Sequence, residues 1–591
     1  MESALEIRRV TMAKDYSKLG KDDLLKIIGK LEARKKYGLI WDEEKTKEQF
    51  EKESENALPV LKEVKGKEIK TDPAKPTNIL IEGDNYHSLS VLNYTHQGKI
   101  DVIYIDPPYN TGQNDFKYND NWIDENDAYR HSKWLSFMSK RLRLAKLLLK
   151  DDGVIFISID DNEMAQLKML CDDIFGEQNR LSTHHIQVRY GNKSLNEKKD
   201  FQELLEYALI YAKDKYFFEA NKSREEYDLD KFNLEIRELR KPDKSLEING
   251  KKVDIFFANS YSITKKGKGD IDLFKETWLS GSIYSGTGHG KTYQKIVENR
   301  VKTDGLSTLY KIYGLGEDGL GYRYMINPQR ASSTRGKMFT KIPIEKREAL
   351  EIGNSEIYRP ILNFYDFSPD FGNIRHEGGI GFNSGKKPVK MLKQLINYHK
   401  NKNAIVLDFF AGSGSTAHAV LTLNREDNGE RCFILCTNNE ENICTDVCYP
   451  RIKNVIKGHQ SVEALGGNLK YFKTSFVKNS ISRDDLKLRI TRECTEMLCL
   501  REGIFDEVKA KPDYHIFEQN GRIMAVYYAL EQDGLEQLKK ELDRMKGEKI
   551  LYCFTLDPLG LDKNDFVDWK GVSLEPIPQK ILDIYEQIYE Y

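Results

Sequence analysis

The residues best suited to chemistry form the tetrapeptide Asp106-Pro107-Pro108-Tyr109, which ends an apolar run from Lys99 to Ile105. The two prolines fix φ and remove two N–H donors, so the turn is stiff and its carbonyls can face outward. Asp106 and the Pro107 carbonyl could both accept hydrogen bonds from an aromatic NH2 group, which would stabilise the positive charge that develops when its nitrogen attacks an electrophile. Tyr109 offers a ring on which a base can stack, a contact worth ~1–3 kcal/mol. The pattern predicts chemistry at an exocyclic amine, and a plain rigid Asx-Pro turn after a strand is the alternative.

A second motif, Phe410-Ala411-Gly412-Ser413-Gly414, joins an expected strand over Ala404–Phe409 to an expected helix. The two glycines let the backbone approach a ligand, and the N–H groups at the start of the helix attract a carboxylate or phosphate. Ala417 stands where a dinucleotide fingerprint would have its third glycine. Alone the motif is also compatible with a purely structural turn; together the two motifs predict one binding and reaction site.

The two motifs can form one site only if a sheet brings the ends of their strands together. The chain shows the pattern expected of such a sheet, because short apolar runs alternate with amphipathic segments. Such alternation favours a mainly parallel sheet covered by helices on both faces, with ligands beyond the carboxyl ends of the strands. The expected strands are Asn78–Glu82, Lys99–Ile105, Gly153–Ile159, Ser182–Val188, Leu204–Tyr211, Ala404–Phe409 and Arg431–Thr437, and the expected helices include Trp134–Lys150, Asn162–Phe175 and Val389–His399.

Composition and charge argue against a globally basic protein, a membrane protein and a disulfide-stabilised protein. The 591 residues carry a net charge of -1, so any nucleic-acid partner would be met by a local basic surface. No stretch approaches the ~18–20 apolar residues of a membrane span, and the start has no signal peptide, so a cytoplasmic location without membrane contact is expected. The eight cysteines are too few and scattered for a disulfide framework.

The two motifs resemble those of the amino-methyltransferases of DNA, which pair (D/N/S)PP(Y/F/W) with FxGxG. The order here, DPPY before FAGSG with a long insert between them, is similar to the permuted β group of that family. The resemblance implies a Rossmann-like α/β fold, S-adenosylmethionine as cofactor, no metal, and an adenine N6 flipped out of double-stranded DNA. The catalytic residues it implies are Asp106, Pro107, Pro108 and Tyr109. The cofactor-binding residues it implies are Asp84, Asn85, Lys387, Pro388, Asp408, Phe410, Ala411, Gly412, Ser413, Gly414 and Thr416.

More narrowly, ARKKYGLIWDEE, TNNEENICTDVCYPRIKNVI and LEPIPQKILDIYEQIY resemble the modification subunit of type III restriction–modification systems. That resemblance implies a homodimer and a separate restriction subunit. The expected parts are an N-terminal helical region (1–75), the catalytic half of the core (76–220), a target-recognition insert (221–345), the cofactor half (346–465) and a C-terminal domain for dimerisation or partner contact (466–591).

The insert carries basic runs with interleaved aromatic residues, which suit phosphate contact and base reading, although a solvated surface would look similar. These runs are Arg237–Lys244, Lys265–Lys268 and Arg330–Lys341. Ser285–Thr292 mimics a phosphate-binding P-loop but lacks its leading glycine, so a Lys-bearing loop is expected instead. One departure from the family concerns the ribose of the cofactor: Thr437-Asn438-Asn439 ends the strand where family members often have an acid, and Glu440 and Glu441 follow.

Other candidates favour structural roles. The spacing of Cys432, Cys436, Cys444 and Cys448 is permitted for zinc, but cysteines along an apolar strand are more often buried thiols. His184 and His185 fall in an expected strand, and Phe201 is either a second stacking ring for the base or a core residue. The alternatives to an adenine enzyme are a cytosine-N4 DNA methyltransferase, an enzyme acting on RNA or a protein amide, and a catalytically idle DNA-binding subunit.

Overall fold

The computed structural model describes residues 57–589 with short gaps at 114, 119–120, 192–199, 353–355, 373, 383–385, 461, 481, 531–532 and 558, and a few earlier residues, 20–21, 39–41 and 48. Most of the helical region expected over 1–75 lies outside the described residues. The chain forms two compact units, one of residues 1–221 with 362–591 and the other of residues 222–361. The second unit ends beyond the expected residue 345, because β18 (Glu356–Tyr358) pairs with β9 (Arg224–Glu226).

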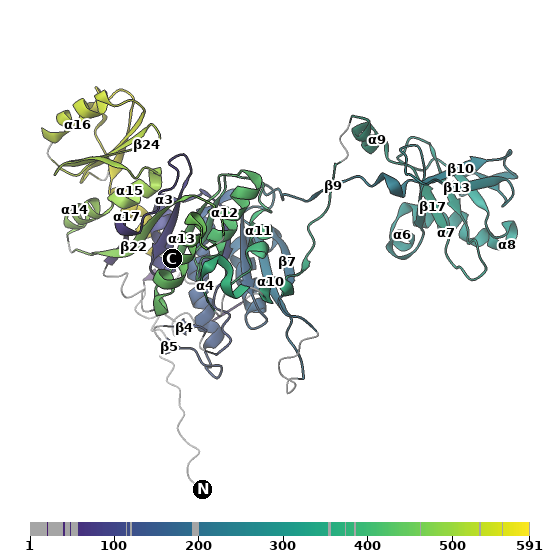
Figure 1. Ribbon diagram of the computed structural model, residues 1–591, viewed down its shortest axis with the longest axis horizontal. Helices are drawn as coiled ribbons and strands as arrows, with labels where there is room; N and C mark the ends of the chain where they lie inside the picture. Colours follow the sequence, from purple (N-terminus) through teal and green to yellow (C-terminus); the bar gives the residue numbers. More distant parts are fainter. Residues whose placement is uncertain are drawn as a thin grey trace, which may run out of the picture. The chain divides into compact units, whose positions relative to one another are not determined.

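A ten-stranded sheet forms the centre of the first unit (Figure 1). Its inner strands β22, β2, β21, β20, β3 and β6 run parallel, while β8 pairs antiparallel with β6 and β7, and β1 pairs antiparallel with β22. In spatial order the strands are β1 (Ala57–Glu63), β22 (Asn468–Lys478), β2 (Thr77–Glu82), β21 (Cys432–Thr437), β20 (Ile405–Asp408), β3 (Ile100–Ile105), β6 (Leu149–Ile159), β8 (Leu205–Ala212), β7 (Arg180–Gln187) and β19 (Phe364–Asp366).

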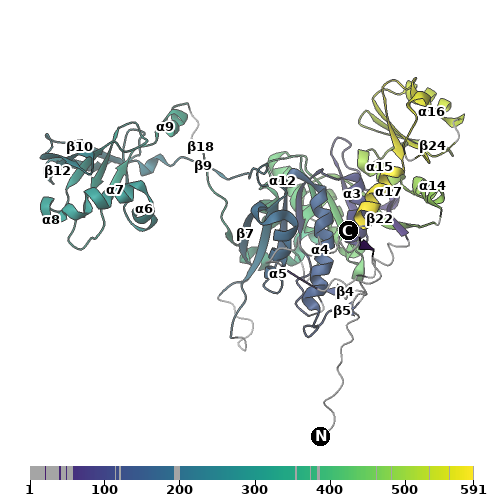
Figure 2. The same cartoon turned by 180° about the vertical axis from the view of Figure 1, so that it is seen from behind.

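Helices cover both faces of this sheet, as the apolar strands require (Figures 1 and 2). Every residue of β3 is buried. One face carries α3 (Asn85–Thr95), α4 (Arg130–Leu148) and α5 (Met164–Cys171), and the other carries α11 (Val389–Ile396), α12 (Ser415–Asp427) and α13 (Tyr449–Lys457). The chain leaves β20 through α12 toward β21 and leaves β3 through α4 toward β6, in opposite directions. This reversal creates a switch point, where α/β sheets bind ligands.

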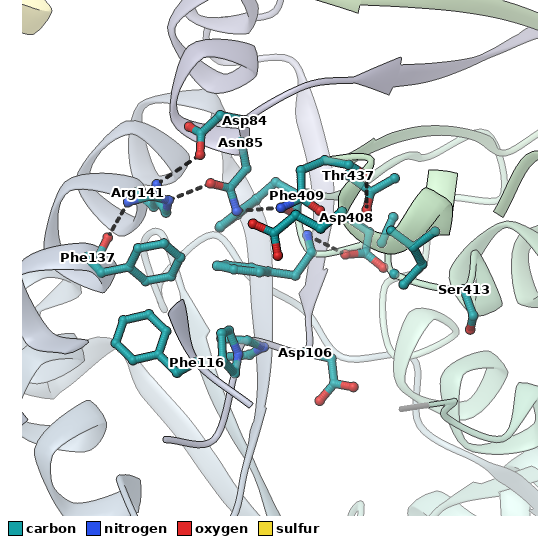
Figure 3. A pocket seen from close by; sticks show the side chains of 18 of the residues that line it. Asp84, Asn85, Asp106, Phe116, Phe137, Arg141, Asp408, Phe409, Ser413 and Thr437 are labelled. Carbon is teal, nitrogen blue, oxygen red and sulfur yellow. Dashed lines mark hydrogen bonds and ion pairs between the residues drawn. The ribbon is translucent and has the colours of Figure 1, made fainter. Parts of the chain in front are cut away.

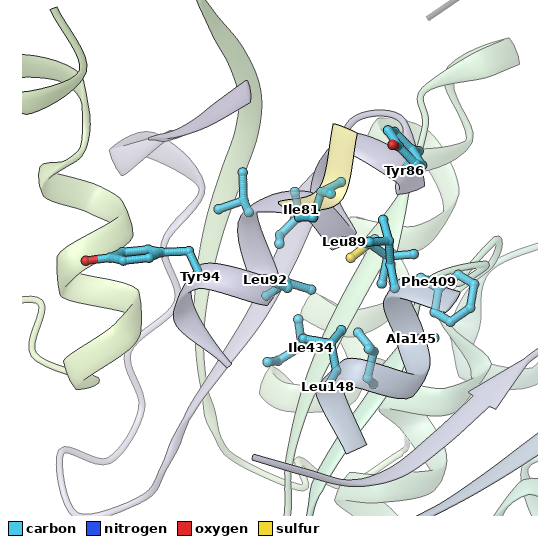
Figure 4. Packing of buried hydrophobic residues seen from close by; sticks show 14 of the residues in the cluster. Ile81, Tyr86, Leu89, Leu92, Tyr94, Ala145, Leu148, Phe409 and Ile434 are labelled. Atoms are coloured by element: carbon cyan, nitrogen blue, oxygen red, sulfur yellow. The ribbon is translucent and has the colours of Figure 1, made fainter. Parts of the chain in front are cut away.

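The C-terminal part packs against α3. The Arg501 guanidinium lies 5.0 Å from the centre of the Tyr94 ring, and the Tyr585 hydroxyl donates to the Pro59 carbonyl. Figure 4 shows Tyr94 directed toward a C-terminal helix, away from the cluster around Leu92. The elements of this part are α14 (Arg483–Glu493), α15 (Thr495–Glu502), β23 (Glu507–Ala510), β24 (Tyr514–Gln519), β25 (Arg522–Tyr527), α16 (Asp533–Arg544), β26 (Glu548–Phe554), β27 (Val572–Ile577) and α17 (Gln579–Tyr589).

The second unit has its own core, which the sequence pattern did not reveal. Its six-stranded antiparallel sheet buries Val253, Ile255, Tyr310 and Ile312 under α7. The strands in order are β11 (Lys244–Ile248), β12 (Lys251–Phe256), β15 (Leu309–Tyr313), β16 (Tyr322–Ile326), β17 (Lys337–Thr340) and β14 (Lys275–Trp278), and β10 (Leu234–Glu238) pairs with β13 (Tyr261–Lys265).

Two local expectations are wrong. Ser285–Thr292 is not a loop: it spans the end of α6 (Gly281–Gly286) and the start of α7 (Gly288–Ile296), where the Thr287 side chain accepts from the Gly290 N–H and caps the helix. Phe201 is not a core residue, since it is 89% exposed. Among the described residues, no helix is long and apolar enough to cross a membrane.

Candidate active site

The two motifs meet at one edge of the large sheet. β20 and β3 are parallel neighbours, with Val406 opposite Val102, so Asp408 and Asp106 follow adjacent strand ends. Both residues line a cavity of about 930 Å³. The cavity therefore joins the DPPY turn, the FAGSG turn and the start of α3 at the switch point of the sheet.

The FAGSG turn presents the start of α12 to this cavity. Gly412 and Gly414 have φ of 49° and 77°, a left-handed conformation that favours glycine. A Cβ on Gly412 would meet only the Phe410 carbonyl, at 3.8 Å, so the backbone is open on this side. Asp408 fixes the turn by accepting from the Phe410 N–H at 3.0 Å and from the Thr416 hydroxyl at 2.5 Å. Burial raises the pKa of Asp408 to about 7.

Opposite this turn, a buried arginine holds the start of α3. Arg141 donates to Glu48 at 3.0 Å, to Asp84 at 3.3 Å and to the Asn85 side-chain oxygen, and Asn85 donates to the Phe409 carbonyl at 3.0 Å. Figure 3 shows the contacts of Arg141 with Asp84 and Asn85, and that of Asn85 with Phe409, along one side of the cavity. The network links α3 and α4 to the end of β20, so it connects the two halves of the core across the insert.

Replacing Arg141 with methionine should lower the free energy of unfolding by about 3–5 kcal/mol, because it removes one member of a buried ion pair with Glu48. The matched control is Arg143→Met on the same helix, whose half-exposed side chain lies 3.7 Å from Asp173. That change should cost less than about 1 kcal/mol. Chemical denaturation of both variants measures the difference, and equal losses would contradict the assigned network.

Two charged side chains from other parts of the chain, Lys387 and Glu206, lie beside the DPPY turn. The Lys387 ammonium lies 3.0 Å from Asp106 Oδ1 and 3.3 Å from Glu206 Oε2. The same Glu206 oxygen accepts from the Tyr109 hydroxyl at 2.9 Å. Burial raises the pKa of Asp106, and the Lys387 charge acts in the opposite direction. The site can therefore hold an acceptor carboxylate beside an aromatic ring.

Neighbouring groups set the shape of this turn. The Trp134 indole N–H donates to the Pro108 carbonyl at 2.8 Å, whereas no described residue donates to the Pro107 carbonyl. Asn110, fully buried with φ of 58°, donates to Glu163 Oε1 at 2.5 Å. The turn is thus held from behind, which leaves the Asp106 carboxylate and the Pro107 carbonyl as the acceptors for a substrate.

An aromatic wall closes the cavity between the two motifs. The Phe137 ring centre lies 5.2 Å from that of Phe116 and 5.8 Å from that of Phe410. The Arg141 guanidinium lies 3.7 Å from the Phe137 ring centre. Figure 3 shows Phe116 and Phe137 close together on the side opposite Ser413. Apolar and aromatic walls with a few fixed polar groups are typical of small-molecule sites.

Most residues expected at the site line this cavity: Asp84, Asn85, Asp106, Pro107, Pro108, Tyr109, Lys387, Asp408, Phe410, Ala411, Gly412, Ser413 and Thr416. Pro388 and Gly414 are outside its lining. Pro388 is the residue before α11, and a Cβ on Gly414 would meet the Cys448 sulfur at 3.1 Å, behind the turn. Asn439 is occupied as an acceptor for the Cys444 and Thr445 N–H groups, while Asn438 and Glu440 line the cavity.

Sequence reasoning missed Glu48, Arg141, Phe137 and Glu206, which also line the cavity. The four clustered cysteines are not among the described groups that could share a metal ion; Asp101, Asp152 and His399 form that group instead. Asp101 there accepts from Asn401 and the Ile405 N–H and pairs with Lys150, so its oxygens are used within the fold.

Comparison with known proteins decides the family. The family profile of the N6/N4 type described as DNA methylase matches residues 100–447, more than half of the chain and both motifs. The chain belongs to this family. Membership identifies the reaction of this family, the transfer of a methyl group to an exocyclic amine of a DNA base. It also accounts for the presence of an acceptor turn beside a Gly-rich turn.

Several relatives of this DNA methylase are similar over long stretches. The type II methyltransferase M.KpnI of Klebsiella pneumoniae is 31% identical over 62% of this chain and 82% of its own. The probable HindVI Mod subunit of Haemophilus influenzae is 28% identical over 83% of this chain and 68% of its own. The EcoPI Mod subunit of Escherichia phage P1 is 30% identical, with 58% of its length covered. Among solved structures, the PvuII DNA methyltransferase, described as cytosine-N4-specific, is 11% identical with a TM-score of 0.30, over 73% of this chain and 96% of that one.

Proposed function

We propose that this DNA methylase transfers the methyl group of S-adenosylmethionine to the N6 amine of an adenine flipped out of double-stranded DNA. One observation carries the proposal: a single cavity holds an acceptor carboxylate beside an aromatic ring, and the open start of a helix next to it. A base inside a duplex cannot reach such a recessed site, so it must leave the stack.

The residues present fit the cofactor. The N–H groups at the start of α12 suit its carboxylate, the open backbone at Gly412 allows close approach, and Phe410 and Phe137 offer apolar surface for its adenine beside Asp84 and Asn85. Glu440, half-exposed at the cavity edge, is the acid proposed for the ribose hydroxyls. When bound, the cofactor supplies an electrophilic methyl group.

The protein's part in the reaction is to orient the target amine. Tyr109 stacks the base, while Asp106 and the Pro107 carbonyl accept from its two N–H groups. With the cofactor bound, the nitrogen lone pair would take up the methyl group that the cofactor releases, and the nitrogen would become positive. Asp106, already hydrogen-bonded to that nitrogen, stabilises the charge and accepts the departing proton, a form of electrostatic preorganisation.

Because of this role, the rate of methylation should fall at low pH. Asp106 can stabilise the positive nitrogen and take up its proton only when ionised, and burial raises its pKa, against the opposing effect of Lys387. The other titratable groups that interact with it are Glu206, Tyr109, Tyr104 and Asp408. The rate of methyl transfer should therefore increase with pH, with a midpoint above the pKa of an ordinary aspartate. It should become constant at higher pH. Single-turnover rates across pH test this, and a flat profile down to the ordinary aspartate range would contradict it.

We propose the second unit, residues 222–361, as the target-recognition domain. It contains 26 Lys and Arg against 20 Asp and Glu, a net charge of +6, whereas the rest of the chain carries -7. A basic unit within an otherwise acidic protein suits contact with phosphates, which supply most of the non-specific affinity for DNA. Its antiparallel sheet is a rigid base for loops that read base edges.

The decisive experiment is expression in a methylation-free host, followed by methylome sequencing and digestion of the DNA to nucleosides. The proposal expects N6-methyladenine at one short sequence. N4-methylcytosine would establish the alternative that shares the same pocket chemistry, and methylated RNA or protein without methylated DNA would overturn the DNA assignment.

The chain covers 58% or less of three of the curated Mod subunits it matches. By analogy with those relatives, we propose that it is the modification subunit of a type III restriction–modification system, that it works as a homodimer in the cytoplasm, and that a separate restriction subunit is its partner. Co-purification from the native host and light scattering of the purified chain test these assignments.

A further inference from the structure

The Lys387 ammonium lies where the proposed reaction requires the target amine. It lies 3.0 Å from Asp106 Oδ1 and 4.9 Å from the centre of the Tyr109 ring. The side chain is only 9% exposed. Lys387 comes just before Pro388, the N-cap of α11.

A target amine needs the same two partners at once. It must donate to the Asp106 carboxylate while its ring lies against Tyr109. Stacked rings are in van der Waals contact, so a base on this face of Tyr109 leaves no room for an ammonium above it. The Lys387 ammonium therefore lies where the amine of a base stacked on this face would be, the amine subsite.

Glu206 gives the displaced ammonium a second counterion. Its Oε2 already lies 3.3 Å from the Lys387 nitrogen and accepts from the Tyr109 hydroxyl at 2.9 Å. A buried cation without a carboxylate is strongly disfavoured, so Lys387 can leave Asp106 only where another acid receives it. Glu206, at the start of β8, is that acid.

We propose that Lys387 fills the amine subsite until a flipped base displaces it toward Glu206, and that Glu206 is the positioning residue which makes this exchange possible. The inference rests on the proposed function and deepens it. When only a fraction of the protein is in the conformation that can bind a ligand, the apparent affinity for that ligand is reduced by the same fraction. The two residues should thus affect capture of the base in opposite directions.

The test uses a duplex with 2-aminopurine next to the adenine that the wild-type chain methylates, in the presence of S-adenosylhomocysteine. The target adenine keeps its N6 amine, and the rise in 2-aminopurine fluorescence when this neighbouring adenine leaves the stack reports capture. Glu206→Gln should weaken capture by roughly tenfold, because Asp106 becomes the only carboxylate for Lys387, and Lys387→Met should strengthen it by several-fold. Lys390→Met, at the second residue of α11 with a side chain 69% exposed, is the matched control and should leave capture unchanged.

Cofactor binding by calorimetry checks that each variant is folded, and Lys387→Gln replaces the methionine variant if that fails to fold. Capture that weakens in both variants, or changes in neither, would overturn the inference while an active wild type upholds the proposed function. Weaker cofactor binding by Lys387→Met with unchanged capture would also overturn it and assign the ammonium to the cofactor's carboxylate. A wild-type chain that methylates no duplex would overturn the proposed function itself.

Discussion

Replacing Asp106 with alanine is expected to reduce the rate of methyl transfer by at least about a thousandfold, the scale of loss when a group that stabilises transition-state charge is removed. Asp106 is the carboxylate of the DPPY turn and sits beside Tyr109 at the end of β3. Affinity for S-adenosylmethionine should remain largely intact, because the contacts that fix the FAGSG turn involve Asp408 and not Asp106.

Single-turnover transfer of a labelled methyl group measures the loss, and calorimetry measures cofactor binding. Asp151→Ala is the matched control: this aspartate is on β6, next to β3, but its side chain is 77% exposed and outside the cavity. Near-normal turnover by Asp106→Ala would exclude it as the acceptor. Loss of cofactor binding together with activity would indicate instead that Asp106 holds the cofactor.

Excision of residues 222–361, with Asn221 joined to Leu362 by a short Gly-Ser linker, should leave a folded core that binds cofactor but no longer selects a DNA sequence. Pairing of β9 with β18 brings the two ends of the unit side by side, so a short linker can close the gap. Each unit has separate buried clusters, so removal exposes little core. The preference for the recognised sequence should fall by at least about a thousandfold, the lower end of the usual specificity ratio.

Fluorescence anisotropy with the recognised duplex and a scrambled duplex of equal length measures that preference for both chains. Cofactor affinity equal to that of the full chain is the control for folding of the core. Methylation of the same sequence by the excised chain would show that recognition resides elsewhere.

The DPPY and FAGSG turns could be predicted because each is a contiguous run of residues whose backbone demands are local. Glu206 and Arg141 could not. Glu206 is one acid at the start of an apolar strand, and Arg141 is one basic residue in an amphipathic helix, where a solvated position is the usual interpretation. Their roles depend on partners far along the chain, Lys387 and Glu48, and only the tertiary fold brings these together.

The same contrast holds for the fold. Much of the large sheet was predictable because β2, β3, β6, β20 and β21 are mostly buried and read as apolar runs. The strand β22, which lies inside the same sheet, was not predicted there, because the sequence pattern placed residues from 466 onward in a separate C-terminal domain. The sheet of the second unit was not predictable, because its strands mix exposed charged residues with buried ones: in β11, Lys244–Glu247 are exposed and only Ile248 is partly buried. Short strands of this kind show no steady period, so the insert looked irregular.

The order of strands in the large sheet also bears on how the protein is made. β2 and β3 are close in sequence, yet β21 and β20, which follow the insert, lie between them. While the ribosome is still translating the first 400 residues, β3 can pair with β6, but β20 and β21 have not been made, so the edges of β2 and β3 that they will cover stay open. The central sheet can close only after residue 437 has left the exit tunnel, so the nascent chain should need chaperone protection longest during synthesis of the insert.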